Sequence, residues 1–177
     1  MQLNRRTLAS LAPAALLAAG QDTERGAPKR RTLVLVRHAE TGGDTRTDRD
    51  PELSEAGAQR AADLASLFGH AGVTHLFSSE YKRTQATLAP LAEAAELKVQ
   101  VISARDAEAQ IRALDALPEG SVAVVAGHSN TVPALVQKLG GTFAQHPDAP
   151  EGPPTLLHDQ YSRLFVLTGP STLELRY

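Results

Sequence analysis

The residues of this sequence best suited to chemistry are two arginines and two histidines: Arg37, His38, Arg83 and His128. A guanidinium group presents a planar fork of donors that matches phosphate oxygens, and two of them neutralise most of the charge of a phosphomonoester. A neutral imidazole is a competent nucleophile toward phosphorus, and a second, protonated imidazole can donate to the transferring oxygens. If the fold brings these four side chains together, they predict phosphoryl transfer through a covalent phosphohistidine.

Guanidinium groups beside an imidazole also favour its neutral form. The pKa of an ordinary histidine is near 6.5, and nearby positive charges lower it. We therefore expect the nucleophilic imidazole to be deprotonated before substrate arrives.

Each of the four residues follows a predicted strand. The apolar run that begins at Thr32 leads into Arg37 and His38. The other expected strands are 73–79, 98–103, 121–127, 162–169 and 172–177, and the expected helices are 54–72, 80–97, 106–117 and 130–141. Pro90 is expected to kink or split the second helix, and residues 142–154 are expected to form a loop.

This alternation predicts an α/β fold, a three-layer sandwich whose mostly parallel central sheet carries helices on both faces. The last two strands are expected to form a hairpin around Gly169 and Pro170. Ligands of open α/β sheets bind just beyond the carboxyl ends of the strands. The arginines and histidines are therefore expected to converge on one crevice.

Four motifs, in this order along the chain, resemble the histidine phosphatase superfamily, which includes cofactor-dependent phosphoglycerate mutases, acid phosphatases and phosphohistidine phosphatases. They are LVRHAET, DPELSEAGAQRA, FSSEYKRTQAT and VVAGHSNT, and the resemblance covers Leu33 to Gly141. It implies a phosphoglycerate mutase-like fold and the activity of a phosphoric monoester hydrolase. It also implies that His38 is the nucleophile, that Arg37 and Arg83 clamp the phosphate, and that His128 is the second phosphate-binding histidine.

The general acid is where the sequence departs from the family pattern. In the acid-phosphatase branch this carboxylic acid directly follows the second histidine, where this chain has Ser129. In the mutase branch it lies after the third strand, where this chain offers Asp106 and Glu108, and Glu80 is a third candidate. We favour Asp106 because it opens a helix on the crevice side. With no acid, phosphates with good leaving groups and phosphoramidates would remain as substrates.

Composition restricts the other possibilities. The 177 residues suffice for one domain, which we place at 32–177, and a net charge of −2 argues against nucleic-acid binding. The absence of cysteine excludes disulfides, thiolate zinc sites and a cysteine nucleophile. We expect no metal and no cofactor. The remaining four histidines are interpreted as structural: His70, His75, His146 and His158.

The amino-terminal segment is predicted to be a signal peptide. Residues 1–20 combine Arg5 and Arg6 with an apolar, acid-free run, which is typical of an export signal of the twin-arginine type or of the general route. Residues 21–31 are expected to be a linker. The protein is therefore expected to be exported, periplasmic or extracellular, with no stable membrane insertion after signal cleavage.

Three functions remain open at this stage. The leading one is a metal-independent phosphatase that acts on a phosphorylated small molecule or a phosphoprotein. The alternatives are a mutase-like phosphotransferase and a noncatalytic protein that binds a phosphorylated ligand.

Overall fold

The computed structural model describes residues 30–43, 47–169 and 171–177. The predicted signal peptide and residues 21–29 of the predicted linker lie outside this part of the chain. Within the described residues, no helix is long and apolar enough to cross a membrane.

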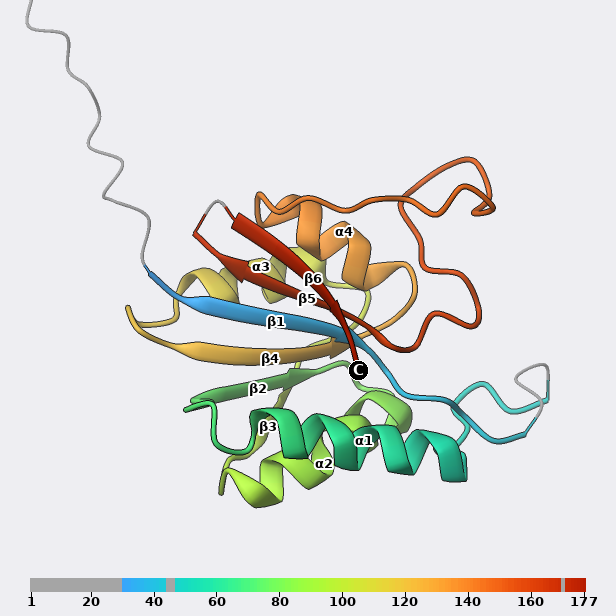
Figure 1. Ribbon diagram of the computed structural model, residues 1–177, viewed down its shortest axis with the longest axis horizontal. Helices are drawn as coiled ribbons and strands as arrows, with labels where there is room; N and C mark the ends of the chain where they lie inside the picture. The colour runs from blue at the N-terminus through green and yellow to red at the C-terminus, as the bar shows by residue number, and fades with distance from the viewer. Residues whose placement is uncertain (1–29, 44–46, 170) are drawn as a thin grey trace, which may run out of the picture.

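A six-stranded sheet forms the centre of the described part of the molecule (Figure 1). The order of its strands is β3-β2-β4-β1-β5-β6. The strands are β1 (Thr32–Arg37), β2 (His75–Ser78), β3 (Val99–Val101), β4 (Val122–Gly127), β5 (Arg163–Thr168) and β6 (Ser171–Arg176). The first four run parallel, whereas β5 lies antiparallel to β1 and pairs with β6 as a hairpin. The predicted mostly parallel sheet and its terminal hairpin are confirmed.

Helices cover both faces of this sheet, as predicted. They are α1 (Glu55–Phe68), α2 (Lys82–Ala94), α3 (Ala107–Asp115) and α4 (Thr131–Lys138). Helices α1 and α2 lie on one face, and α3 and α4 lie on the other (Figure 1). Helix α2 is continuous through Pro90, so the expectation that this proline could split the helix was wrong.

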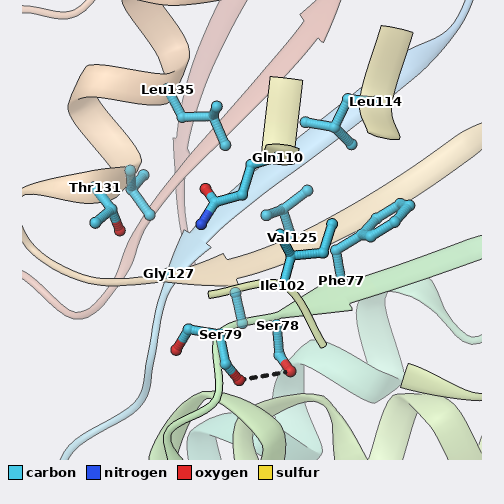
Figure 2. Close-up of a pocket in the computed structure, with 12 residues that line it drawn as sticks. Phe77, Ser78, Ser79, Ile102, Gln110, Leu114, Val125, Gly127, Thr131 and Leu135 are labelled. Carbon is cyan, nitrogen blue, oxygen red and sulfur yellow. Dashed lines mark hydrogen bonds between the residues drawn. The ribbon is translucent and has the colours of Figure 1, made fainter. Parts of the chain in front are cut away.

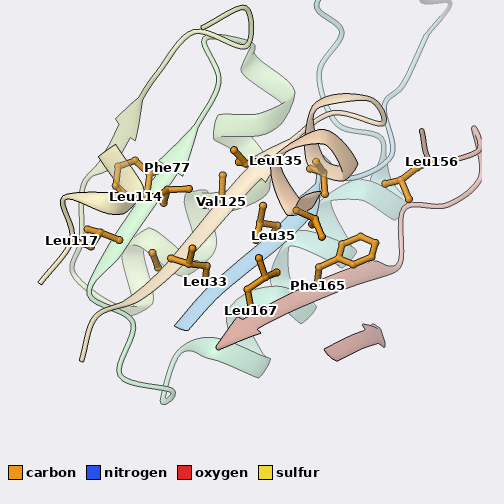
Figure 3. Close-up of a cluster of buried hydrophobic side chains, with 13 residues drawn as sticks. Leu33, Leu35, Phe77, Leu114, Leu117, Val125, Leu135, Leu156, Phe165 and Leu167 are labelled. Atoms are coloured by element: carbon orange, nitrogen blue, oxygen red, sulfur yellow. The ribbon is translucent and has the colours of Figure 1, made fainter. Parts of the chain in front are cut away.

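The two faces of the sheet carry separate apolar clusters, because alternate residues of a strand point to opposite faces. From β1, Val34 and Val36 pack toward α1 and α2. Leu33 and Leu35 join the cluster under α3 and α4, which includes Phe165 of β5 (Figure 3). Strand β1 is therefore buried on both sides, as its unbroken apolar run predicts.

The pairing of β1 with β4 positions the residues that follow these strands. Arg37 lies opposite Gly127 in the parallel register, and the N–H of His38 donates to the carbonyl of Gly127 at 2.8 Å. His38 and His128 therefore leave neighbouring strands at the same level. A side chain at Gly127 would lie 2.8 Å from Oγ1 of Thr131, so glycine permits the close approach of α4.

Candidate active site

The rings of His38 and His128 lie side by side beyond the carboxyl edge of the sheet. Their centroids are 5.4 Å apart, with an angle of 63° between the ring planes. Both residues are buried, with 7% and 8% of their surfaces exposed. The predicted convergence of the two histidines is confirmed.

Backbone geometry fixes the proton of His38. Its Nδ1 lies 2.8 Å from the carbonyl oxygen of Ala39, which can only accept a hydrogen bond. Nδ1 must therefore carry the hydrogen in the neutral ring, and Nε2 keeps its lone pair. Burial, followed by the charge of Arg37, lowers the pKa of His38 to about 3. The imidazole is accordingly neutral across the physiological pH range.

A chain of hydroxyl groups fixes the proton of His128 in the opposite sense. Its Nε2 lies 2.9 Å from Oγ of Ser79, which lies 2.8 Å from Oγ1 of Thr84. Thr84 donates to the carbonyl of Tyr81 at 2.8 Å, so it must accept from Ser79, and Ser79 accepts from Nε2. The lone pair of His128 is thus on Nδ1. Burial, followed by the charge of Arg83, lowers the pKa of His128 to about 4.

Arg37 is held by backbone carbonyls and an aromatic ring. Its Nη1 donates to the carbonyls of Leu157 at 2.8 Å and His158 at 3.0 Å. Its guanidinium carbon lies 3.9 Å from the ring centroid of Tyr161, a cation–π distance. Its buried Nε has no hydrogen-bond partner within the described chain. Because none of these contacts is a salt bridge, the positive charge of Arg37 remains available to an anion.

Arg83 is anchored differently, by a carboxylate. Its Nη1 donates to Oδ1 of Asp50 at 3.2 Å and to the carbonyl of Arg49 at 3.1 Å. Its Nη2 lies 3.5 Å from Nδ1 of His128, and its guanidinium carbon lies 4.3 Å from the ring centroid of Tyr81. Arg83 therefore faces the lone pair of His128, as a second phosphate-binding group would.

Two hollows meet at this set of residues, and both are lined by His38 and Arg83. The hollow on the His128 side has a volume of about 370 Å³ and also contains Arg105. The hollow on the Arg37 side has a volume of about 200 Å³ and also contains Arg49. The site is thus open to solvent and strongly cationic, which suits an anionic ligand.

The three carboxylates proposed as general acid are not arranged for that role. Asp106 is exposed and caps α3, where its carboxylate accepts from the N–H of Ala109 at 2.8 Å. It lines neither of the two hollows, so the structure does not bring it to the histidines. A carboxylate that caps a helix bonds to the N–H groups of that helix. For this reason, the position of Asp106 at the start of a helix near the crevice did not predict a catalytic role.

Glu108 and Glu80 also have partners of their own. Glu108 pairs with Lys138 at 3.0 Å, away from the histidines. Glu80 accepts from the N–H of Ala104 at 2.7 Å, and this hydrogen bond lowers the pKa of its carboxyl group. Glu80 contributes a negative charge that acts on His128, but a carboxyl group with a lowered pKa is deprotonated near neutral pH and has no proton to donate.

Sequence reasoning missed several residues that hold the site together. Tyr161 and Tyr81 each stack on one of the two arginines. Ser79 orients His128, and Asp50 anchors Arg83. His158, interpreted as structural, lines the smaller hollow. Tyr81 lies within the motif FSSEYKRTQAT and Tyr161 lies beyond all four motifs, and nothing in one sequence distinguishes a stacking tyrosine from a core tyrosine.

The fold and this site define a class. A mixed sheet with helices on both faces, and a pocket of histidines and arginines beyond its strand ends, is the arrangement of a phosphoglycerate mutase-like α/β protein. Residues 33–106 match the sequence profile of the histidine phosphatase superfamily, branch 1, and this segment contains Arg37, His38 and Arg83. Over this segment, the chain is similar to the histidine phosphatase superfamily.

Solved structures share the fold. A structure of SixA from Agrobacterium tumefaciens is 24% identical, with a TM-score of 0.60, over 84% of this chain and 96% of that chain. The mycobacterial glucosyl-3-phosphoglycerate phosphatase complexed with VO3 is 17% identical, with a TM-score of 0.59, over 83% and 98% of the two chains. The protein histidine phosphatase SixA complexed with tungstate is 16% identical, with a TM-score of 0.57, over 81% and 94%. No curated protein shows significant sequence similarity to the chain.

Proposed function

We propose that this protein hydrolyses a phosphomonoester or a phosphoramidate through a covalent phosphohistidine on His38, without a metal ion. The observation that carries the proposal is the pair of neutral imidazoles, 5.4 Å apart, between two guanidinium groups at one edge of the sheet. Vanadate and tungstate are tetrahedral or expanded oxyanions that resemble phosphate. Their presence in two structures of the same fold supports a phosphorylated ligand for this protein.

In the first step, the lone pair on Nε2 of His38 attacks phosphorus. The N–P bond forms as the bond from phosphorus to the leaving group breaks. The leaving group departs with the electron pair and takes a proton from solvent. The hydrogen bond from Nδ1 to the carbonyl of Ala39 holds the ring in the tautomer that this attack needs. Arg37 and Arg83 stabilise the negative charge on the phosphoryl oxygens.

In the second step, water attacks phosphorus and the N–P bond breaks. The water loses a proton, inorganic phosphate leaves, and Nε2 recovers its lone pair. His128 starts both steps neutral, with the lone pair of Nδ1 facing Arg83. A substrate that binds as a monoanion brings a proton that Nδ1 can accept, and the imidazolium then donates to a phosphoryl oxygen.

The leaving group must suit a site with no poised carboxylic acid among Asp106, Glu108 and Glu80. Phosphoramidates meet this condition because their nitrogen is protonated more easily than an ester oxygen, and aryl phosphates meet it because they leave as weak bases. Three structures of the same fold carry the name SixA, and one of them is called a protein histidine phosphatase. This supports a phosphoramidate as one substrate class.

The test is hydrolysis of 4-nitrophenyl phosphate by the purified protein with excess chelator, beside His38→Ala and a matched control, His70→Ala. His70 is exposed and lies outside the site. We expect turnover that survives the chelator, vanishes in His38→Ala and persists in His70→Ala. Acid-labile, alkali-stable phosphate on the quenched protein would identify the phosphohistidine. Full activity in His38→Ala would overturn the proposal, and tight phosphate binding with no hydrolysis would favour a noncatalytic binding protein.

The cellular location is part of the same proposal. A signal at residues 1–20 would place the phosphatase outside the cytoplasm, where its substrates would be exported or external phosphate compounds. Fractionation of cells that express the full chain, compared with a variant in which Arg5 and Arg6 are both lysine, tests this. Retention of both proteins in the cytoplasm would contradict it.

A further inference from the structure

We propose that the groove between helices α3 and α4 binds the leaving group of the substrate, and that this leaving group is apolar and uncharged. The inference rests on the proposed phosphatase function and adds the substrate class. The groove is a hollow of about 440 Å³, within the usual size of a small-molecule site. It shares Ala104, Asn130 and Thr131 with the hollow that contains His38 and His128. A phosphate between the histidines could therefore extend its substituent into the groove without a break.

The groove is lined mainly by carbon atoms. Its apolar walls come from three segments and include Ala107 of α3, Ala134 of α4 and the Pro153-Pro154 pair. The one charged residue among the described lining is Lys138, and its ammonium group is already paired with Glu108 at 3.0 Å. Of the polar side chains in the lining, Gln110, Thr131 and Thr155 already hydrogen-bond to the backbone, and Asn130 is the remaining one. The lining therefore favours an apolar substituent over a sugar or a second phosphate.

The groove is also held in one shape. Its outer wall is fixed to the residue that follows His128, because the N–H of Leu156 donates to the carbonyl of Ser129 at 2.8 Å. On the opposite side, the amide of Gln110 donates to the carbonyl of Ser103 at 2.9 Å. The prolines of the outer wall restrict its backbone further. A preformed groove costs less entropy to fill than a loop that must be ordered.

A second, small apolar pocket, drawn in Figure 2, shares residues with the groove. Gln110, Thr131 and Leu135 line both spaces, while Leu114 and Phe77 belong to the smaller one. Its free volume of about 10 Å³ holds roughly one water molecule. The pocket that adjoins the groove is thus also apolar, and the face between α3 and α4 is incompletely filled.

The first experiment compares two substrates whose leaving groups have similar acidity but different apolar size, phenyl phosphate and 2-naphthyl phosphate. Burying one methylene-sized group favours binding by a factor of about four, so partial burial of the second ring predicts a kcat/KM that is roughly tenfold higher for the naphthyl ester. Glucose 6-phosphate, whose alcohol is polar, should be the poorest of the three. Equal kcat/KM values for the two aryl esters would overturn the inference.

Variants that fill the groove sharpen this comparison. Ala134→Leu and Ala107→Leu place bulk in the groove from two different helices, and Ala62→Leu places the same bulk on the exposed surface of α1 as a control. We expect the ratio of the two kcat/KM values to fall to near one in both groove variants and to stay near ten in Ala62→Leu. An unchanged ratio in both groove variants would show that the naphthyl ring binds elsewhere.

A binding measurement separates failure of this inference from failure of the proposed function. Methylphosphonate and naphthylmethylphosphonate cannot be hydrolysed at the P–C bond, so their affinities, measured by calorimetry, do not depend on turnover. Tighter binding of the naphthyl compound, lost in Ala134→Leu, supports the groove even if no ester is hydrolysed. If hydrolysis requires His38 but the two phosphonates bind with equal affinity, the proposed phosphatase function stands and the proposed leaving-group site in the groove is wrong.

Discussion

The two sides of the active site use the same three residue types in different surroundings. The β1 half consists of Arg37, His38 and Tyr161, and the β4 half consists of Arg83, His128 and Tyr81. In each half the arginine stacks on the tyrosine, and the histidine packs edge-on against the same ring. The halves differ in what holds them: backbone carbonyls fix the β1 half, whereas the side chains of Asp50 and Ser79 fix the β4 half.

Because of this difference, the protonation of His38 is fixed, whereas the protonation of His128 can change. Backbone carbonyls do not titrate, and those that hold Arg37 and His38 leave the charge of Arg37 unopposed by a salt bridge. The hydroxyl chain through Ser79 holds only the Nε2 proton of His128, so Nδ1 can gain and lose a proton, and a carboxylate partly neutralises Arg83. The β1 half therefore suits the nucleophile that we propose, whose tautomer must not change. The β4 half suits a group that gains and loses a proton during the reaction.

Removing the two histidines in turn gives the largest expected contrast. His38→Ala should lower kcat for an aryl phosphate by about 10⁴-fold or more, because the covalent route is lost. His128→Ala should lower it by roughly 10²–10³-fold, as expected for one preorganised donor to the transition state. Single-turnover kinetics with quantification of phosphoenzyme measures both effects. Equal losses, with phosphoenzyme formed in neither variant, would contradict the division of roles.

Lysine substitutions of the two arginines test the anchoring. Arg37→Lys should lower kcat/KM by roughly 10²-fold, because Nη1 of Arg37 binds both carbonyls, and a lysine has no second nitrogen to face the phosphate. Arg83→Lys should cost roughly tenfold, since its ammonium group can still pair with Asp50. Steady-state kinetics with the thermal midpoint as a control for folding distinguishes these losses. A larger loss of kcat/KM in Arg83→Lys than in Arg37→Lys would contradict this account of how the two arginines are held.

The sequence predicted the arginine and histidine side chains of this site better than it predicted the residues that surround them. Arg37, His38 and His128 were predictable because they follow apolar runs whose strands pair in parallel, and parallel strands place their carboxyl ends at one edge. Asp106 was misplaced because a helix-opening aspartate is equally suited to capping, and only geometry shows which role it has. The stacking tyrosines and the Ser79 chain depend on contacts between distant segments, which no local pattern records.

Acidification should destabilise the protein through both histidines. Their pKa values in the folded protein, about 3 for His38 and about 4 for His128, lie below the unfolded value near 6.5. Between these limits the unfolded chain binds protons that the folded protein excludes. The free energy of unfolding is therefore fully retained above pH 6.5 and falls as the pH drops toward 4, by on the order of 3 kcal/mol for each histidine.

Urea unfolding at pH 7 and pH 4.5 measures this loss. The wild type should lose more stability than His38→Gln or His128→Gln, because a glutamine does not titrate. His70→Gln, on the surface, should behave as the wild type does. A pH dependence that is the same in all four proteins would mean that neither buried ring excludes a proton.

The tyrosines give the smallest expected effect and the closest test of symmetry between the halves. A cation–π contact of this kind contributes about 0.5–1 kcal/mol, so Tyr81→Leu should lower kcat/KM by about three- to fivefold as Arg83 loses its stacking surface. Tyr161→Leu should cost more, because Tyr161 is buried and no carboxylate of the described residues forms a salt bridge with Arg37. In both positions phenylalanine keeps the ring and should restore most of the activity. A loss in Tyr161→Phe as large as that in Tyr161→Leu would show that the hydroxyl group, and not the stacked ring, supports Arg37.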